Sequence, residues 1–266
     1  MTRVRRAAVA GSFYPGRSDE LREMIDEMLA EARSELGNLD DPAPKAVISP
    51  HAGYIYSGPI AAKAYLRLGA GRDRIRRVVL LGPSHFVWVD GVAVTSADQF
   101  ETPLGIVPID AKAREAIQSL PQVAVSDHPH LREHSLEVQI PFLQTVLDDF
   151  MLLPIAVGES TAAEVAEVLE RVWDGEETVI VISSDLSHYH PYDTARRIDE
   201  QTARAIDSLA RTDILPEEAC GCRPINGMIR AARDHGLTAK RLDLRNSGDT
   251  AGPRDGVVGY GAWELR

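Results

Sequence analysis

The sequence has few cysteines, no long apolar segment and a deficit of positive charge. Its two cysteines, Cys220 and Cys222, are one residue apart, a spacing that would strain a mutual disulfide. No apolar run approaches the ~20 residues needed to span a bilayer. The apolar stretch after the basic N-terminus is shorter than the ~7–15-residue core of a signal peptide. We therefore expect a cytoplasmic protein whose fold does not depend on disulfides.

The charge balance is acidic. The 266 residues include 40 acidic and 29 basic side chains, for a net charge of −11. This balance disfavours nucleic acid and an anionic membrane surface as partners. The hydrophobic content of 44% is ordinary for a globular protein with a sizeable core.

Several common catalytic motifs are missing. Without a G-x-S-x-G motif, no serine is favoured as the nucleophile of a hydrolase. The glycine-rich segments GSFYPG and GDTAGPRDG lack the spacing of phosphate-binding loops, so we interpret them as turns.

Apolar strands alternate with amphipathic helices along the chain. Helices are expected over 18–36, from Pro59, over 111–120, after the polar loop 126–135, over 161–173, over 194–209 and over 224–236. Strands are expected over 46–49, 77–81, 92–95, 122–125, 151–157 and 178–182, with a hairpin or irregular excursion over 99–110 and two strands near a sheet edge in the C-terminal tail. Ser18 is expected to cap the first helix, and Gly37 to end it. The pattern predicts an α/β protein, a single domain over 1–266, with a mostly parallel or mixed central sheet covered by helices on both faces.

Histidines follow three of the predicted strands. His51 comes after strand 46–49, His85 after strand 77–81, and Asp185 and His188 after strand 178–182. If these strands are parallel neighbours, their carboxyl ends deliver the side chains to one edge of the sheet, where open α/β sheets bind ligands. Because imidazole is a common metal ligand and a proton carrier near neutral pH, we expect a site there.

Other residues are open to more than one interpretation. His134, beside Glu133, either faces the same edge or caps a helix, whereas His128 and His130 are expected in a solvated loop. Cys220 precedes a helix and is a candidate metal ligand, a reactive thiol or a small buried residue. The rings of Tyr54 and Tyr56 either line a substrate cleft or pack in the core.

Seven segments in this order together resemble the Memo family, of the AmmeMemoRadiSam system protein B type: GSFYPG (11–16), PHAGYIYSG (50–58), LGPSH (81–85), ETPLG (101–105), EHSLEVQIPFL (133–143), SSDLSH (183–188) and CGCRPI (220–225). The resemblance implies a fold like that of the class III extradiol non-haem iron dioxygenases. It also implies that His51, His85 and Cys220 face a metal, and that His134, Asp185 and His188 form the rest of the polar cleft wall. It gives Cys222 no role.

Three functions are open for such a cleft. The dioxygenases bind iron through two histidines and a glutamate, whereas a cysteine thiolate shifts the preference toward copper, zinc or thiolate-bound iron. We expect an iron- or copper-dependent oxidoreductase in which His134 or His188 moves a proton and Asp185 orients a histidine or a water. The alternatives are a non-catalytic binding or adaptor protein and, with zinc, a hydrolase of amides or esters.

The expected partners follow from the same resemblance. They are a small-molecule or peptide ligand in the cleft and, through a shared pathway, radical-SAM and AMMECR-type proteins.

Overall fold

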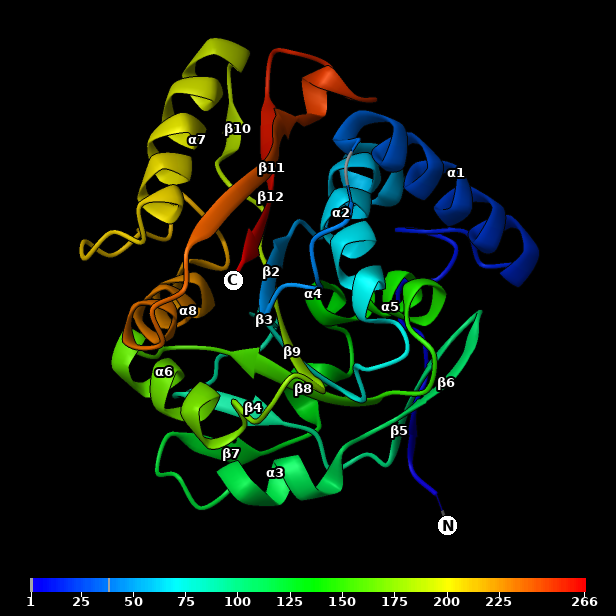
Figure 1. Ribbon diagram of the computed structural model, residues 1–266, viewed down its shortest axis with the longest axis vertical. Coiled ribbons are helices and arrows are strands. Elements are labelled where there is room, and N and C mark those ends of the chain that lie inside the picture. The colour runs from blue at the N-terminus through cyan, green and yellow to red at the C-terminus, as the bar shows by residue number, and fades with distance from the viewer. Residues whose placement is uncertain (1, 38) are drawn as a thin grey trace.

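The computed structural model describes residues 2–37 and 39–266; Met1 and Asn38, which the predicted domain also spans, lie outside the described residues. A central sheet has the strand order β10-β12-β2-β9-β3-β8-β4-β7, and β11 also pairs with β12 (Figure 1). Its strands are β2 (Ala46–Ser49), β3 (Arg77–Pro83), β4 (Val92–Val94), β7 (Val123–Val125), β8 (Met151–Val157), β9 (Thr178–Ser183), β10 (His188–His190), β11 (Ala239–Asn246) and β12 (Val257–Leu265).

The middle of this sheet is parallel. β2 pairs with β9, β9 with β3, and β3 with β8, all in the same direction. β12 runs antiparallel to β2, and β4 runs antiparallel to β8, so the sheet as a whole is mixed. The predicted α/β class with a mixed central sheet is confirmed. The strands that precede His51, His85 and Asp185 are parallel neighbours, as the expected site requires.

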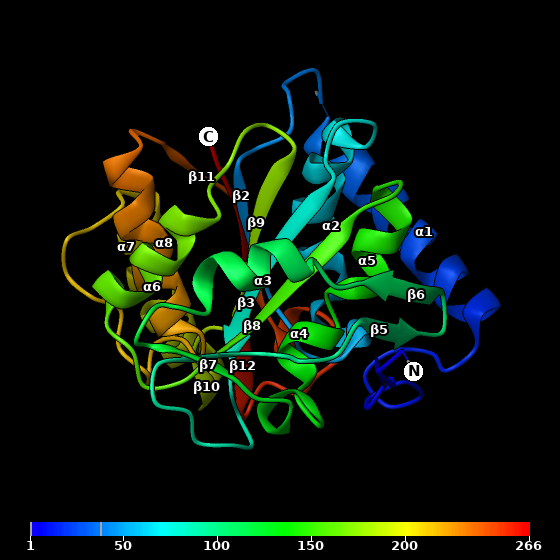
Figure 2. The ribbon, with the colours of Figure 1, turned by 90° about the horizontal axis from the view of Figure 1, so that it is seen from below.

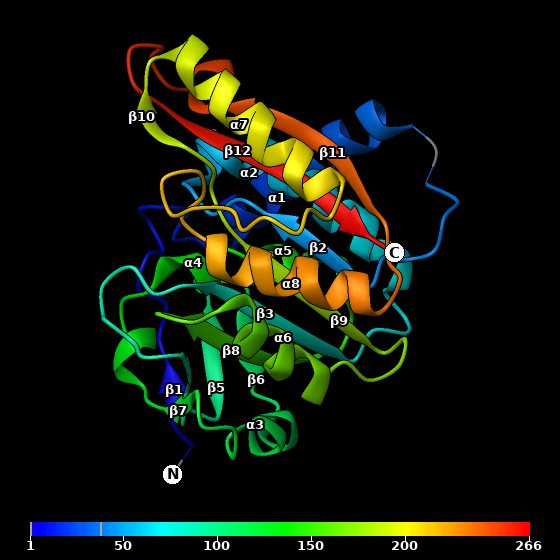
Figure 3. The same cartoon turned by 90° about the vertical axis from the view of Figure 1, so that its left-hand side faces the viewer.

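Helices cover both faces of the sheet. One face carries α1 (Ser18–Leu36), α2 (Tyr54–Leu68), α4 (His134–Glu137) and α5 (Ile140–Val146), and the other carries α3 (Ala111–Ile117), α6 (Ala162–Arg171), α7 (Tyr192–Asp207) and α8 (Cys222–Asp234) (Figure 2). Figure 3 shows α7 in front of β11 and β12, with α8 and α6 below it on the same face of the sheet. Short 3₁₀ turns occur at Gly69–Gly71, His128–His130 and Ser247–Asp249. Among the described residues, no helix combines the length and apolarity needed to cross a membrane.

Two hydrophobic cores explain the continuous apolar strands. In β2, Val47 packs into the core under α1 and α2, whereas Ala46 and Ile48 pack into the core under α6 and α8. Successive strand residues point to opposite faces, and both faces are covered here, so each position favours an apolar side chain.

A small second sheet lies beside the main one. It consists of β1 (Val4–Arg5), β5 (Gln99–Thr102) and β6 (Gly105–Pro108), with β5 and β6 antiparallel and β1 parallel to β5. The predicted hairpin over 99–110 is thereby confirmed, whereas β1 is too short to give a sequence signal.

The structure corrects three local predictions. The residue before the first helix turn is Arg17, which makes no side-chain cap, so Ser18 is already helical. The second helix begins at Tyr54 and contains Pro59, which lacks an N–H to donate within the helix. Of the two tail strands, β12 is not at an edge, because it pairs with β2 on one side and with β10 and β11 on the other.

Candidate metal centre

Three imidazole rings meet at the carboxyl ends of the parallel strands. One ring nitrogen from each of His51, His85 and His134 lies within 4.8 Å of the other two. The rings of His85 and His134 are stacked, with centroids 4.7 Å apart, and that of His51 stands nearly perpendicular to both. We call these three residues the histidine cluster.

The cluster depends on the docking of α4 against the end of β3. The Ser135 hydroxyl donates a hydrogen bond to the Pro83 carbonyl over 2.9 Å. A Cβ atom at Gly82 would lie 2.8 Å from Ser135 Oγ, so a side chain there would push α4 away. The approach places His134, the first residue of α4, beside His85.

Hydrogen bonds fix the tautomer of His51. The Ser183 hydroxyl donates to the Ser135 carbonyl over 2.6 Å, so its oxygen is left to accept. It accepts from the Gln139 amide at 2.8 Å and from His51 Nδ1 at 2.9 Å. His51 therefore carries its proton on Nδ1, and the lone pair of Nε2 is free for a metal or a proton.

Glu133 has a similar effect on His85. Its carboxylate accepts from the His85 backbone N–H at 2.6 Å and from His85 Nδ1 at 2.9 Å, and lies 3.5 Å from His134 Nδ1. Burial alone would raise the pKa of this carboxyl, but the hydrogen bonds and charge of His85 and the backbone N–H of Ser135 lower the pKa to about 2. An ionised Glu133 therefore holds the Nδ1 proton of His85 and leaves its Nε2 free.

Sequence reasoning assigned Glu133 no function. The signal available was its position directly before His134 in the segment EHS. That position alone does not reveal that the carboxylate points back toward the end of another strand.

Cys220 and Asp185 lie against His51. Cys220 Sγ is 3.3 Å from His51 Nε2, and the Asp185 carboxylate accepts the His51 backbone N–H over 2.7 Å. Burial, and then the charge of Asp185, raise the pKa of the Cys220 thiol. Burial also raises the pKa of Asp185. The thiol is therefore a fourth possible donor that would lose its proton on binding a metal.

Two histidines of the cluster, His51 and His134, favour the neutral form. Burial, followed by the charge of His85, lowers the pKa of His51 well below its usual value. Burial and the charge of His51 lower the pKa of His134 to about 4. Neutral imidazoles at pH 7 are the form that binds metals.

The remaining predicted site residues, His188, Tyr54 and Tyr56, are not part of the histidine cluster. His188 lies in β10, opposite Val258, and its charge contributes to the lowered pKa of His51. Tyr54 is a core residue: its hydroxyl donates to the Val138 carbonyl and its side chain is buried. Tyr56 is half-buried and packs against the edge of the same core.

The loop before α4 contains a correction. His128 is exposed, as expected, but His130 is buried, and its Nε2 lies 3.1 Å from the Ala93 carbonyl. The prediction of a solvated loop is wrong for His130, because the 3₁₀ turn directs its ring into the protein. Cys222 is buried in the core under α6 and α8 and is not part of the cluster.

The donor set suits a transition metal. Three imidazoles and a thiol are ligands of zinc, copper and iron. The Nδ1 atoms of His51 and His85 are held by hydrogen-bond partners, as is usual for metal-ligating histidines. The residues present therefore fit a bound metal ion.

Comparison with known proteins agrees with the family resemblance of the seven sequence segments. The family model described as "Memo-like protein" matches residues 5–264. The chain belongs to the Memo-like family. A MEMO1 family protein of Aquifex aeolicus is 39% identical, with 97% of each chain covered. A MEMO1 family protein of Nitrosopumilus maritimus is 34% identical, covering 97% of this chain and 98% of its own.

Among solved structures, the chain is similar to the uncharacterized protein JW3007 from Escherichia coli K12. The TM-score is 0.54 at 17% identity, over 82% of this chain and 98% of that one. At this identity the likeness concerns the fold alone.

Proposed function

We propose that this Memo-like protein binds a transition metal through His51, His85, His134 and Cys220. The observation that carries the proposal is the convergence of three imidazole nitrogens within 4.8 Å, two of them oriented by Ser183 and Glu133. Cys220 supplies a thiol in contact with His51 Nε2. Hydrogen-bonded partners that fix the ligand tautomers are typical of metal sites.

We propose further that the bound metal is iron or copper and that the protein is an oxidoreductase, cytoplasmic in location. Either metal would supply one-electron chemistry and activation of a bound ligand. His188, which is not among the proposed ligands, would move the proton. Asp185 positions His51 through the backbone.

The test is elemental analysis of anaerobically purified protein. Stoichiometric metal in the wild type, lost in His51→Ala, His85→Ala and Cys220→Ala, supports the site. His128→Ala is the matched control, because His128 is an exposed histidine outside the cluster. No metal after reconstitution with iron, copper or zinc would overturn the proposal.

Activity is tested separately by oxygen uptake of the reconstituted protein. Uptake with iron or copper that is lost in His188→Ala while the metal is retained supports the oxidoreductase. Stoichiometric zinc without oxygen consumption over a broad substrate panel would instead favour hydrolysis.

A non-catalytic binding function is a second candidate, favoured by exposed aromatic side chains next to the cluster. Phe86 is 54% exposed and Trp88 75% exposed, directly after His85, and Arg132 lies over the Phe86 ring. Such side chains are typical of protein or peptide contacts. A stoichiometric partner whose binding is lost in both Phe86→Ala and His51→Ala would support this function. Functional association with radical-SAM and AMMECR-type proteins stays a prediction.

A further inference from the structure

A cavity of about 300 Å³ lies beside the proposed donor set. His85 and Cys220 form part of its lining, which places it next to the metal ligands. The rest of the lining includes Trp88, Glu159 and Arg223. The cavity therefore joins the donor set to an aromatic ring and an ion pair.

Backbone contacts fix the walls of this cavity. The Glu159 N–H donates to the Val89 carbonyl over 2.8 Å, and the Gly158 N–H donates to the Gly91 carbonyl over 2.9 Å. A Cβ atom at Gly158 would lie 2.1 Å from the Val89 oxygen, so only glycine allows this close approach. The Ser84 hydroxyl donates to the Val87 carbonyl over 2.6 Å. The loop that carries Trp88 is thus held in place before any ligand binds.

Arg223 brings a cation to the cavity with part of its binding capacity unused. In the described part of the chain, its guanidinium binds one partner, the Glu159 carboxylate, through a single nitrogen. The two side chains are 30% and 56% exposed. A guanidinium has five N–H donors and binds carboxylates in a two-point geometry. Arg223 is therefore able to donate hydrogen bonds to a second carboxylate.

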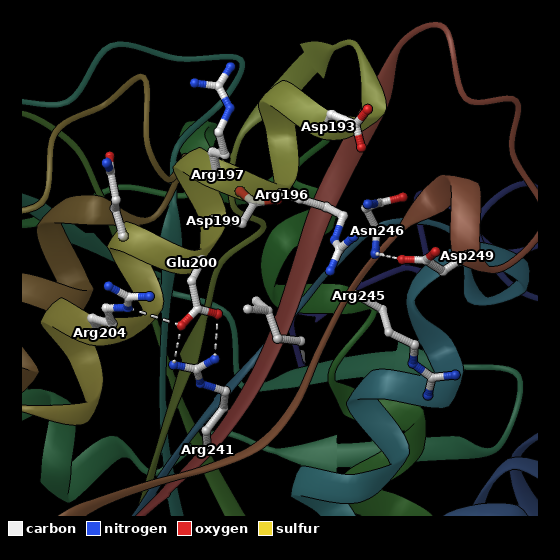
Figure 4. A pocket seen from close by; sticks show the side chains of 12 residues that line it. Asp193, Arg196, Arg197, Asp199, Glu200, Arg204, Arg241, Arg245, Asn246 and Asp249 are labelled. Atoms are coloured by element: carbon white, nitrogen blue, oxygen red, sulfur yellow. Dashed lines mark hydrogen bonds and ion pairs between the residues drawn. The ribbon is translucent and has the colours of Figure 1, made fainter.

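A larger cavity of about 670 Å³ between α7 and β11 differs in this respect (Figure 4). There Arg241 binds both Glu200 and Asp207, and Arg204 also binds Glu200. Arg241 thus already contacts two carboxylates, whereas Arg223 contacts one, and the described residues that line this larger cavity include neither a histidine nor a cysteine.

We infer that the smaller cavity binds a small organic carboxylate whose acid group is held by Arg223. Its apolar part would lie against Trp88, and its reactive part would face His85 and Cys220. The inference rests on the proposed function, because the cavity adjoins the donor set. Because Glu159 already offsets the charge of Arg223, each added negative charge is repelled, which favours a singly charged carboxylate over a doubly charged phosphate.

The test compares benzoate with benzamide, its neutral analogue of nearly the same shape, by ligand-observed NMR titration of the full-length protein. Benzoate should bind more tightly than benzamide. Arg223→Gln should weaken benzoate roughly tenfold or more and leave benzamide unchanged, because a hydrogen-bonded charge pair is lost. Arg204→Gln is the matched control, an arginine that also binds one glutamate but lies in α7, and it should change neither.

Glu159→Gln provides a test of opposite sign. Removing the carboxylate that competes for Arg223 should tighten benzoate several-fold, a change that no general loss of folding would produce. Equal binding of benzoate and benzamide, equal effects of Arg223→Gln and Arg204→Gln, or tighter binding of inorganic phosphate would overturn the inference.

Running the titrations on metal-free and Zn²⁺-loaded protein separates the two proposals. Arg223-dependent benzoate binding without metal binding would refute the metal site alone. Zn²⁺ binding in both wild type and Arg223→Gln, without benzoate binding, would refute the carboxylate site alone.

Discussion

Glu133→Gln is the substitution that tests the histidine cluster most directly. The Glu133 carboxylate accepts from the backbone N–H groups of His85 and Ser135 and from His85 Nδ1, at 2.6 to 2.9 Å. A glutamine offers one oxygen and one NH₂ group, so at least one of these donors would face another donor. Either the backbone N–H or the Nδ1–H of His85 would then lose its acceptor, and an Nδ1 bond that remained would be to a neutral amide oxygen in place of a carboxylate.

Two magnitudes follow for Glu133→Gln. Loss of a partner that orients a metal ligand typically reduces metal affinity 10–100-fold, or about 1.4–2.7 kcal/mol. The lowering of the Glu133 pKa from 4.5 to about 2 corresponds to at most about 3.5 kcal/mol of stability. Because the folded-state pKa is lowered, this stability is present above pH 4.5 and is lost as the pH falls toward 2.

The assays are a Zn²⁺ competition titration against a chelator and urea unfolding of the metal-free protein at several pH values. Glu264→Gln is the matched control. Glu264 is a buried carboxylate of β12 that binds Arg67 and stands opposite Val47, near the start of β2. It should lose stability but keep its metal affinity. Equal metal affinity in Glu133→Gln and wild type, or equal losses in both variants, would refute the reasoning.

Three further outcomes are expected. Burial raises the pKa of Asp199 from 3.8 to about 6, so its charge destabilises the fold above pH 6 and not below 3.8. Asp199→Asn should therefore raise the free energy of unfolding at pH 7.5 by up to about 3 kcal/mol, with no gain at pH 3.5 by urea titration. Gly158→Ala should lower the free energy of unfolding by at least about 1 kcal/mol, because the alanine Cβ would meet the Val89 oxygen. An unchanged urea midpoint would contradict this. The raised pKa of Cys220 should make metal-free protein react with iodoacetamide at pH 8 far more slowly than free cysteine; similar rates, measured by mass spectrometry, would count against that environment.

The most regular elements could be predicted from the sequence. α1 has the predicted bounds, 18–36, because its apolar side chains repeat at helical spacing and Gly37 ends it. β8 has the predicted bounds, 151–157, because a continuous apolar run with flanking polar residues fits a strand covered on both faces. β10 could not be predicted from the sequence, because it is shorter than a usual strand and its backbone is irregular, with a φ of 59° at Tyr189.

The position of the candidate site could be predicted from the sequence, but the contacts that bring its residues together could not. The endings of β2, β3 and β9 placed His51, His85 and Asp185 at one edge, since parallel neighbours share their carboxyl ends. The position of His134 within the cluster depends on how α4 docks, and that follows from tertiary contacts of Ser135. Sequence spacing gives no information on such contacts.

Metal binding by the histidine cluster would also affect the abundance of the protein in the cell. Its members stand at positions 51, 85 and 134 and meet only after β2, β9 and β3 have paired. A metal that binds this cluster binds the completed sheet and not the unfolded chain. At a free concentration 100 times the Kd, it would add about 2.7 kcal/mol to the stability of the whole protein. Metal supply would thereby set how much of the protein escapes proteolysis, so that its abundance would follow the metal content of the cell.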